Sequence, residues 1–581
     1  MIESIIYYDG LGRAIQSVQL KASSNYEDWV SPCEYDSYGR QIREWMHFPS
    51  TGQNGVFRVN PETELSNYYQ SNYPLDFSQN NPNPFSEKRL EASPLGRILE
   101  QGLPGEDWKV GNGHSLRMNH KYNEQNEFRY FTVDLTLNGQ IYLPALVDNQ
   151  EYYEEGTLYK NITRDENWLD NPSSDYPNDH TSEEFIDKLG RVILKRTYNA
   201  NIPHDTYYIY DDVGNLTYTL SPKMDINNGI SQSELDELGF QYVYDNRNRL
   251  VEKKLPGKGR EYIVYNKLDQ VVLTQDSNLE AQLKWLFTSY DAFGRIIYTG
   301  ERYANYGKAY TRTNLDSFSG EQFEERTSSS TSVGNGTIFY SNSTLNGIGD
   351  IAELYTVKYY DSYVDNDGIL LPTNNFFGQK LVYNVQGLST VDKTRVLGTN
   401  FWITTVFGYD YKGRLIYTHT KNPFLQTEEI IEQKLDFTGR VLETRSTHSR
   451  TGNNNLVVNN IFQYDHMGRM LDHNMNINGL DQQLISSNEY NAIGQLIEKK
   501  VGNQKANPLQ TINYSYNVRG WLSRINNPNN LQEDLFAQEL FYNKDAGYPV
   551  YNGNIGKVEW NTYYNSQDPN FFLPRNYVYQ Y

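Results

Sequence analysis

A short phrase recurs along this chain and constrains its fold more than any other feature. It reads Tyr, Asp, two residues, Gly and Arg, usually after an aromatic residue and before a hydrophobic one. Full copies contain Asp9, Gly12 and Arg13; Asp36, Gly39 and Arg40; Asp291, Gly294 and Arg295; Asp410, Gly413 and Arg414; and Asp465, Gly468 and Arg469. Looser copies contain Asp187, Gly190 and Arg191; Asp211 and Gly214; Asp245 and Arg249; and Asp436, Gly439 and Arg440. The chain is therefore predicted to be built from one repeated unit.

The spacing of these copies is nearly constant. Weaker copies carry Asn at the Asp position, and from Asn384 this position returns in steps of 26, 26, 29, 26 and 26 residues, ending at Asn517. Between Asp187 and Asp291 the steps are 24, 34, 21 and 25 residues. A repeat array suits a chain of 581 residues, because each unit needs to pack only against its neighbours.

Each unit is predicted to be a β-hairpin. Residues before the Asp alternate in polarity, as in Phe462-Gln463-Tyr464, which is typical of a half-buried strand. The Asp or Asn can accept a hydrogen bond from the backbone two residues on, and the Gly supplies the positive φ that a type I turn with a G1 bulge requires. Since a lone hairpin is marginal in water, the units must join edge to edge. The predicted fold is all-β, a β-hairpin spiral or β-solenoid.

Regularly spaced carboxylates could in principle hold metals or act as acid/base pairs. Each Asp here sits in the same turn phrase, and Asn replaces it in several copies. A catalytic carboxylate would not repeat a dozen times or tolerate an amide, so the Asp residues are predicted to cap turns. The Arg that follows is predicted to lie across a neighbouring Tyr, with its head group solvated or paired.

Composition supports a thin, extensive β-structure and excludes some partners. The chain has 50 Tyr, a residue whose ring packs on a pleated surface while its hydroxyl reaches water. A formal net charge of −20 repels phosphate backbones and anionic lipid, so no nucleic-acid partner is expected.

The ends of the chain carry no export or membrane signal. No run approaches 18 apolar residues, so no membrane span is expected, and the start at Met1 lacks a basic region followed by an apolar one. Cys33 is the single cysteine and is predicted to be packed. Both ends read as cuts within a larger protein.

The repeated phrases resemble the RHS/YD-repeat family, and several segments resemble large RHS proteins of Bacteroidota. These segments start at Tyr8, Phe185, Tyr516 and Tyr551. The resemblance implies a hollow RHS shell, formed in whole or in part by this chain, around a C-terminal polymorphic-toxin cargo domain downstream of it. It implies a secreted or cell-surface bacterial protein used in competition, with a secretion apparatus or carrier proteins as further partners. No RHS core segment is found here.

Breaks in the period divide the chain. Residues 1–97 are predicted to hold N-terminal strands and the first repeats, and 98–180 a non-repeat insertion or plug-like segment. Residues 181–299 and 357–581 are predicted repeats, the latter truncated before an RHS core, with a flexible polar insertion at 300–356. Residues 51–88 read as an extended connection, and 231–238 as a short helix capped by Ser231.

The predicted function is a non-catalytic structural shell, with no catalytic, cofactor-binding or metal-binding residue. The main alternative is an adhesin or glycan-binding protein that uses Trp45, Trp108 and Trp402 as platforms. A third is a carbohydrate-active enzyme, which needs two carboxylates in one cleft outside the repeat turns. Residues 365–368 distantly resemble a calcium loop but lack its downstream Glu, so a polar turn is expected.

Overall fold

A computed structural model describes residues 3–579, except residues 51, 53, 78–81, 170–175, 304–311, 314, 316, 346–348, 374 and 564–573. The chain is mostly β. The helices are α1 (Pro61–Asn72), α2 (Gln232–Leu238) and α3 (Ser277–Ala281), with a 3₁₀ turn at Glu106–Trp108.

The strands follow in chain order. The first half holds β1 (Ser4–Tyr8), β2 (Ala14–Gln19), β3 (Asp28–Pro32), β4 (Arg43–Trp45), β5 (Phe48–Ser50), β6 (Phe85–Leu90), β7 (Ile98–Gly102), β8 (Leu116–Tyr122), β9 (Thr132–Asn138), β10 (Ile141–Val147), β11 (Tyr159–Arg164), β12 (Thr181–Ile186), β13 (Val192–Asn199), β14 (Ile202–Tyr210), β15 (Leu216–Leu220), β16 (Phe240–Asp245), β17 (Leu250–Lys254), β18 (Glu261–Tyr265) and β19 (Val271–Gln275). The second half holds β20 (Lys284–Tyr290), β21 (Ile296–Tyr303), β22 (Arg326–Val333), β23 (Gly336–Tyr340), β24 (Ile351–Asp361), β25 (Val385–Arg395), β26 (Trp402–Tyr409), β27 (Leu415–Asn422), β28 (Thr427–Leu435), β29 (Val441–Arg450), β30 (Leu456–Tyr464), β31 (Met470–Ile477), β32 (Gln483–Tyr490), β33 (Leu496–Val501), β34 (Gln510–Tyr516), β35 (Leu522–Ile525), β36 (Phe536–Phe541), β37 (Lys557–Thr562) and β38 (Arg575–Val578).

One long antiparallel sheet forms the body of the molecule. Its ladder runs from β4 through β6, β7 and β8 to β11, and then strand by strand to β21. From β21 it continues through β24 and β25 to β38, and the hairpin β9–β10 joins it at β16. Strands β1, β2, β3 and β5 form a separate four-stranded sheet, the N-terminal sheet.

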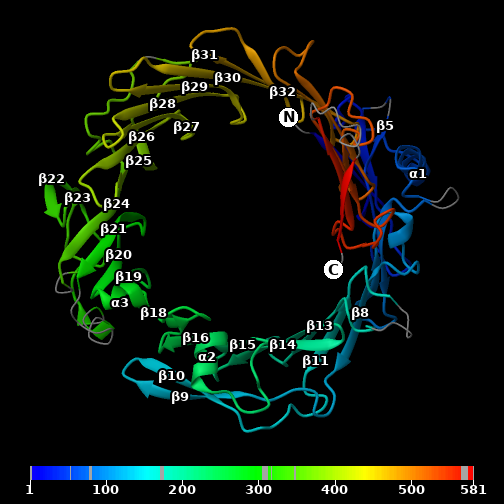
Figure 1. The fold of residues 1–581 in the computed structure, drawn as a ribbon, viewed down its shortest axis with the longest axis horizontal. Coiled ribbons are helices and arrows are strands. Elements are labelled where there is room, and N and C mark those ends of the chain that lie inside the picture. Colours follow the sequence, from blue (N-terminus) through cyan, green and yellow to red (C-terminus); the bar gives the residue numbers. More distant parts are fainter. Residues whose placement is uncertain are drawn as a thin grey trace.

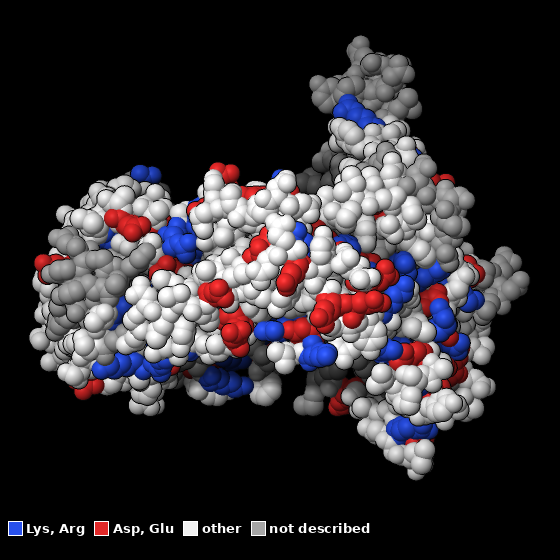
Figure 2. Space-filling view, turned by 90° about the horizontal axis from the view of Figure 1, so that it is seen from below, with Lys and Arg blue, Asp and Glu red and all other residues white. Residues whose placement is uncertain are grey.

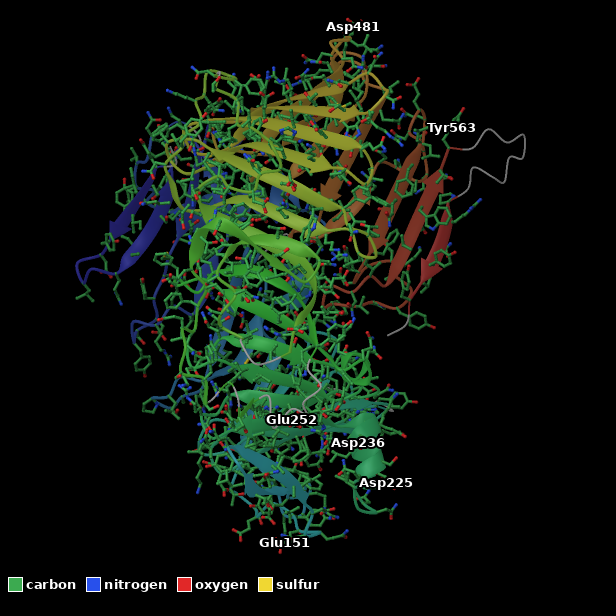
Figure 3. All side chains as sticks on the ribbon, turned by 90° about the vertical axis from the view of Figure 1, so that its left-hand side faces the viewer. Glu151, Asp225, Asp236, Glu252, Asp481 and Tyr563 are labelled. Atoms are coloured by element: carbon green, nitrogen blue, oxygen red, sulfur yellow. The ribbon has the colours of Figure 1, made fainter. Side chains whose placement is uncertain are left out.

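The long sheet curves into a ring. In Figure 1 the colours run around the ring until the blue N-terminal strands lie beside the orange and red C-terminal ones. The strands cross the wall side by side when it is viewed from outside (Figure 3). The two ends of the chain thus come together, although they are separated by most of the sequence.

The insertions cover the outer face of part of the wall. The hairpins β22–β23 and β9–β10 both lie on the side away from the ring centre (Figure 1). Ile338 and Tyr340 of β23 pack with Val357, Tyr359 and Val406 of the wall in one buried cluster. Phe131 and Val133, at the start of β9, pack in a second cluster with wall residues such as Phe185 and Tyr207.

Residues 98–180 and 300–356 depart from the predicted domain plan. The segment 98–180 is neither plug-like nor separate, because β7, β8 and β11 are consecutive strands of the wall. The segment 300–356 is more than a polar insertion, since its described part buries Leu315, Val333 and Leu345. The polar sequence suggested a loosely attached loop. The hairpin β22–β23 nevertheless docks, because a strand with a run of Ser and Thr needs only a few apolar residues to pack on the wall.

Helix α1 corrects the prediction that 51–88 is an extended connection. Pro61 stands at the start of the helix and Glu62 and Glu64 in its first turn, which suits the positive helix N-terminus. Leu65, Tyr69 and Tyr73 recur every four residues and are buried as one stripe. The helix capped by Ser231 is confirmed as α2, where the Ser231 hydroxyl accepts from the Glu234 N–H at 3.1 Å. It projects beside β16, where Asp225 and Asp236 are labelled in Figure 3.

The outer surface mixes both signs of charge. Figure 2 shows acidic and basic side chains interspersed on the face seen from below. None of the described helices is long and apolar enough to cross a membrane.

Candidate functional site: the turn ladder and the seam

Each repeat turn is held by one carboxylate that has several partners. The Asp410 N–H donates to the Arg414 carbonyl at 3.0 Å, and the Gly413 N–H donates to the Asp410 carbonyl at 2.9 Å. Asp410 Oδ1 accepts from the backbone N–H groups of Lys412 and Arg414, both at 2.9 Å. Asp410 Oδ2 accepts from Arg414 Nε at 2.8 Å. Gly413 has φ +73°, which only glycine adopts without strain.

The same geometry recurs around the ring. The acidic side chains that accept both backbone N–H groups and the Arg four residues on are Asp9, Asp36, Asp187, Asp245, Asp291, Asp410, Asp436 and Asp465. The register shifts just before each turn, for example between Ser289 and Tyr290, as a bulge requires.

Where Asn replaces Asp, the partner changes with it. The Asn491 amide donates to Gln495 Oε1 at 2.8 Å, and Asn266 does the same to Gln270 at 2.8 Å. At Asp211 the partner is Asn215, whose amide donates to the carboxylate at 3.0 Å. In most copies the side chains of the first and fifth residues are therefore hydrogen-bonded, as an ion pair, an amide pair or a carboxylate–amide pair, which the Asp and Gly positions alone did not reveal. At Asn517 the fifth residue is Trp521, and only its backbone N–H binds the Asn517 oxygen.

The repeated tyrosine joins each unit to the one before it. The Tyr464 hydroxyl donates to the Val441 carbonyl of the preceding hairpin at 2.9 Å. Nine further copies make the same bond at 2.7 to 3.1 Å: Tyr35, Tyr210, Tyr244, Tyr265, Tyr290, Tyr360, Tyr409, Tyr490 and Tyr542. These hydroxyls were expected to reach water, and instead they bind the neighbouring backbone.

The repeated arginine lies over the next tyrosine, as expected. The Arg13 guanidinium sits 4.6 Å from the ring centre of Tyr35, and Arg295 sits 4.3 Å from that of Tyr360. Arg191, Arg249, Arg440 and Arg469 make the same contact at 4.8 to 5.3 Å. Each head group is thus shared between its own carboxylate and the next unit.

Two turns differ from their predicted positions. Tyr383-Asn384 is not a turn copy, because Asp361 holds the turn that ends at Gly387. Asp361 Oδ1 accepts from the Gly387 N–H at 2.6 Å, and the strands on either side of the turn, β24 and β25, pair with each other. Residues 362–384 are an insertion inside that turn. A further turn was missed at Glu91, whose carboxylate accepts from Arg97 Nε at 3.0 Å. In this turn the Glu precedes the Gly by five positions, whereas the Asp precedes the Gly by three positions in the other copies.

Electrostatics favour the charged form of these turns. Side-chain hydrogen bonds from Arg97 and Ser93 lower the pKa of Glu91 to about 2. Burial works against the charged form of Asp410, but the hydrogen bonds from Arg414 and Lys412 outweigh it and lower the pKa of that carboxyl. The carboxylates of Glu91 and Asp410 are therefore held in the charged form by their partners, which suits a structural role.

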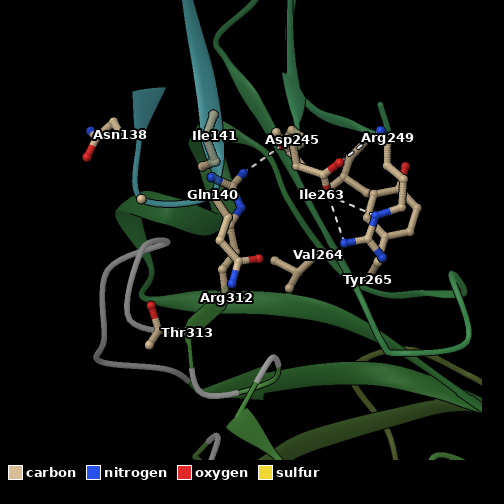
Figure 4. A pocket seen from close by; sticks show the side chains of 12 residues that line it. Asn138, Gln140, Ile141, Asp245, Arg249, Ile263, Val264, Tyr265, Arg312 and Thr313 are labelled. Atoms are coloured by element: carbon tan, nitrogen blue, oxygen red, sulfur yellow. Dashed lines mark hydrogen bonds and ion pairs between the residues drawn. The ribbon is translucent and has the colours of Figure 1, made fainter. Parts of the chain in front are cut away.

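A cavity of about 330 Å³ lies between the tip of β9–β10 and the repeat turn at Asp245 (Figure 4). Its lining includes Asp245, Arg249 and Arg312. Asp245 Oδ2 is bound by Arg249 Nε at 2.8 Å, and the Arg312 guanidinium donates to the Val251 carbonyl at 2.7 Å. Among the described residues that line the cavity, the one carboxylate is that of Asp245, which belongs to a repeat turn. Glycoside hydrolysis needs two carboxylates, and these residues do not supply the second.

The loop at 365–368, which distantly resembles a calcium site, binds the side chain of a lysine from β25. Lys393 Nζ lies 3.0 Å from a carboxylate oxygen of Asp365 and 3.0 Å from one of Asp367. The ammonium group thus occupies the place between the two carboxylates. No cluster of potential metal ligands is found among the described residues.

The tryptophan platforms of the adhesin hypothesis are not exposed. Trp108 is 1% exposed, and its Nε1 donates to the Tyr551 carbonyl at 2.7 Å. Trp45 packs against Phe85 with ring centres 4.6 Å apart. Trp402 packs against the large outer cluster. These three residues therefore act in packing.

Trp108 instead belongs to the contact between the two ends of the chain, here called the seam. It meets Trp521 edge to face at 5.7 Å, and the Arg519 guanidinium lies 4.4 Å from the Trp521 ring and 5.1 Å from that of Trp108. Arg519 is also 3.7 Å from Glu166. The Tyr551 N–H donates to Asn167 at 2.6 Å.

The N-terminal sheet and α1 cover the last repeat turns. Trp29 Nε1 donates to the Ala492 carbonyl at 2.8 Å, and Asp76 accepts from the Val518 N–H at 2.9 Å. The tip residue Val518 is 2% exposed and packs with Phe48, Leu65 and other residues of this segment. The seam therefore joins the chain ends by side-chain packing and hydrogen bonds between regions more than 350 residues apart.

Comparison with known proteins finds a family model over the start of the chain and distant likenesses among solved structures. Residues 1–122, which hold the N-terminal sheet, match a family described as a domain of unknown function, DUF6443. No curated protein matches the chain. Among solved structures, TcdB2-TccC3 without its hypervariable C-terminal region and a Photorhabdus luminescens Tc holotoxin pore with a TccC3 mutation each have a TM-score of 0.39 and 13% identity. A further TcdB2-TccC3 structure has a TM-score of 0.36 and 13% identity. Each alignment covers 99% of this chain, which spans only 26% of the length of those chains.

Proposed function

We propose that this chain is a non-catalytic wall segment of a secreted bacterial shell that encloses a cargo polypeptide. The cargo is a toxin domain encoded beyond residue 581, and a secretion apparatus or carrier delivers the assembly. The observation that carries this proposal is the curved wall, one strand layer thick, whose inward face is not covered by another described element, while the hairpins β9–β10 and β22–β23 lie outside (Figure 1).

The alternation of burial along the strands supports this assignment of faces. In β26, Thr404 and Val406 are buried toward the outer cluster, while Thr405 between them is only half-buried. In β29, β31 and β33 no residue is fully buried, as expected where a single layer meets solvent on both sides.

Where the register is clearest, the inward face carries hydroxyl groups and charges that are paired with each other, such as Lys284 with Glu301 and Lys358 with Asp392. Thr288, Thr299, Thr356 and Thr394 form one row across β20, β21, β24 and β25. Thr299 and Thr356 share a hydrogen bond at 2.7 Å, and Thr405 and Thr420 share one at 3.1 Å in the next strands. Hydroxyl groups that bind each other offer few anchors to a guest, so the wall would hold cargo by enclosure rather than by affinity.

Both edges of the wall carry exposed apolar side chains, which supports a larger assembly. At the repeat-turn edge these are Leu95, Leu189, Val213, Leu268, Phe293, Tyr411 and Phe437, from 56% to 82% exposed. At the opposite edge they include Ile202, Leu283, Leu397, Leu480, Leu509 and Leu535. Rows of this kind usually mark contact surfaces, and further wall laid on either edge would bury them.

The test uses the complete gene product with a photo-crosslinking amino acid at two neighbouring positions of β30. Asn460 lies in register with Thr444 on the inward face, and Asn459 points to the outer face. We expect crosslinks from position 460 to the segment that follows residue 581, read by mass spectrometry, and none from position 459. Equal crosslinking from both positions, or none from 460, would overturn the proposal.

A further inference from the structure

Three of the nine histidines of the chain lie at the seam. The His466 ring, next to a repeat turn, stacks on Tyr26 at 4.1 Å and bonds to the Lys21 carbonyl. The His114 ring stacks on Tyr551 at 3.3 Å. His47 packs in a tilted arrangement against Trp29, with ring centres 4.4 Å apart, and it hydrogen-bonds to the backbone of Ile493. Each imidazole therefore touches the opposite end of the chain or the tryptophan that binds it.

Two of these rings have a buried nitrogen without a partner. His47 Nε2 and His466 Nδ1 are both inaccessible to solvent and make no hydrogen bond. In the neutral ring such a nitrogen is a hydrogen-bond acceptor without a donor. Protonation would turn it into a buried charged donor with nothing to receive it, which is far more costly.

The surroundings of His47 also oppose a positive charge. His47 and Arg519 line one cavity of about 320 Å³ at the seam, together with Tyr69, Gln495 and Val518. The Glu166 carboxylate lies 3.7 Å from the Arg519 guanidinium, which also packs on the ring of Trp108. Two cations would thus share a partly buried site.

His466 and His114 face charges that are already engaged. Beside His466, Asp465 is bound to Arg469 at 2.6 Å, and Lys21 offers only its carbonyl to the ring. Beside His114, the backbone carbonyl of Glu166 binds Nδ1 at 2.9 Å, while its carboxylate faces Arg519.

We propose that the seam is an acid-sensitive latch, in which protonation of His47 in mild acid releases the N-terminal sheet from the last repeat turns. The rest of the wall is held by strand ladders and by turn carboxylates such as Asp410, which is bound by Arg414 at 2.8 Å. Of the wall histidines, His419 faces the Glu428 carboxylate at 3.4 Å, and His120 binds Asn161 at 2.8 Å. Acid is therefore expected to act first at the seam.

The direction of the pH dependence of seam closure follows from which state binds more protons. Burial lowers the pKa of His47 below its ordinary value, and the hydrogen bond to Ile493 only partly offsets this. The opened state then binds protons that the closed state excludes, so closure is favoured above about pH 6.5 and weakens as the pH falls toward the pKa of the closed state. One such group shifts the opening equilibrium by about tenfold per pH unit.

Hydrogen exchange on the complete protein tests this at pH 7.5 and pH 5.5, with correction for intrinsic exchange. The reporting amides are Val518, bound to Asp76, and Tyr551, bound to Asn167. We expect their exchange to rise about tenfold at pH 5.5, while amides of β24 and β25, which contain no histidine, stay protected. No rise at the seam, or an equal rise in β24 and β25, would overturn the latch.

The matched variant carries His47→Gln, which keeps a donor but does not titrate. Its seam should stay closed at pH 5.5, and a persistent rise would contradict the proposal. The control His473→Gln removes a histidine of the wall that binds Asn460 at 2.9 Å, and it should leave the seam transition unchanged. If the seam of the His47→Gln variant is already open at pH 7.5, the comparison of seam and wall amides in the wild-type protein decides.

Discussion

Within a repeat turn, the two oxygens of one carboxylate have different roles. Asp410 Oδ1 satisfies two backbone N–H groups of the turn, while Oδ2 holds the Arg414 head group. An amide can take over the first role unchanged, as Asn491 does for Ile493 at 3.2 Å and Gln495 at 2.8 Å. This explains why Asn is tolerated at some turns although the ion pair is lost.

The prediction at this scale concerns substitution of Asp410. Asp410→Ala leaves two backbone donors without their acceptor, which costs about 1–3 kcal/mol, so exchange of the Lys412 and Arg414 amides should rise by about tenfold or more. Asp410→Asn keeps Oδ1 and should raise exchange less, and adding Arg414→Gln should recover part of the difference. Tyr411→Ala is the control, since Tyr411 is 78% exposed. Equal effects of Ala and Asn would contradict the division of roles.

Between hairpins, the repeated tyrosine is the link that edge pairing alone does not provide. Its hydroxyl reaches the backbone of the preceding unit in ten places, while Leu435 before Asp436 and Ile186 before Asp187 have no hydroxyl at this position. The bond is thus shared by most units but is dispensable in at least two. Stability in such an array is expected to be a sum of unit and neighbour terms.

Tyr464→Phe tests this link. It removes the bond to the Val441 carbonyl and keeps the ring under Arg440, which lies 5.3 Å from the ring centre. We expect a loss of about 0.5–1.5 kcal/mol at the contact of β29 and β30, seen as faster amide exchange there and not in β26. Tyr411→Phe is the matched control, and an equal change in both variants would refute the link.

The sequence predicted the unit well and its interruptions poorly. Asp, Gly and Arg at fixed spacing specify a turn locally, so the hairpins could be predicted from short windows. The insertion at 362–384 was missed because Tyr383-Asn384 imitates the phrase, whereas pairing partners across an insertion have no local signal. Helix α1 was missed because its polar composition hides a stripe of only three buried residues.

For the whole molecule, the ring depends on residues that do not belong to the repeat. Trp108 and Tyr551 are 443 positions apart, and nothing in either neighbourhood indicates the other. The sequence therefore predicted a curved wall but assigned Trp108 to an exposed platform. Its burial at 1% makes it the largest apolar anchor of the seam.

Trp108→Ala should open the ring without unfolding the wall. Removing a buried Trp from a packed site costs about 3–5 kcal/mol, and here it also leaves the Arg519 guanidinium without one of its two aromatic faces. We expect a larger radius of gyration in small-angle scattering and faster exchange of the Tyr551 amide, with the β signal in circular dichroism retained.

Trp285→Ala is the matched control, because Trp285 is equally buried but packs in the outer cluster far from the seam. It should loosen β19 to β21 and leave the Tyr551 amide protected. If both variants expand the molecule alike, the ring is held by the general stability of the sheet. If only Trp108→Ala expands it, the wall keeps its curvature through its repeats and its closure through a few side chains at one place.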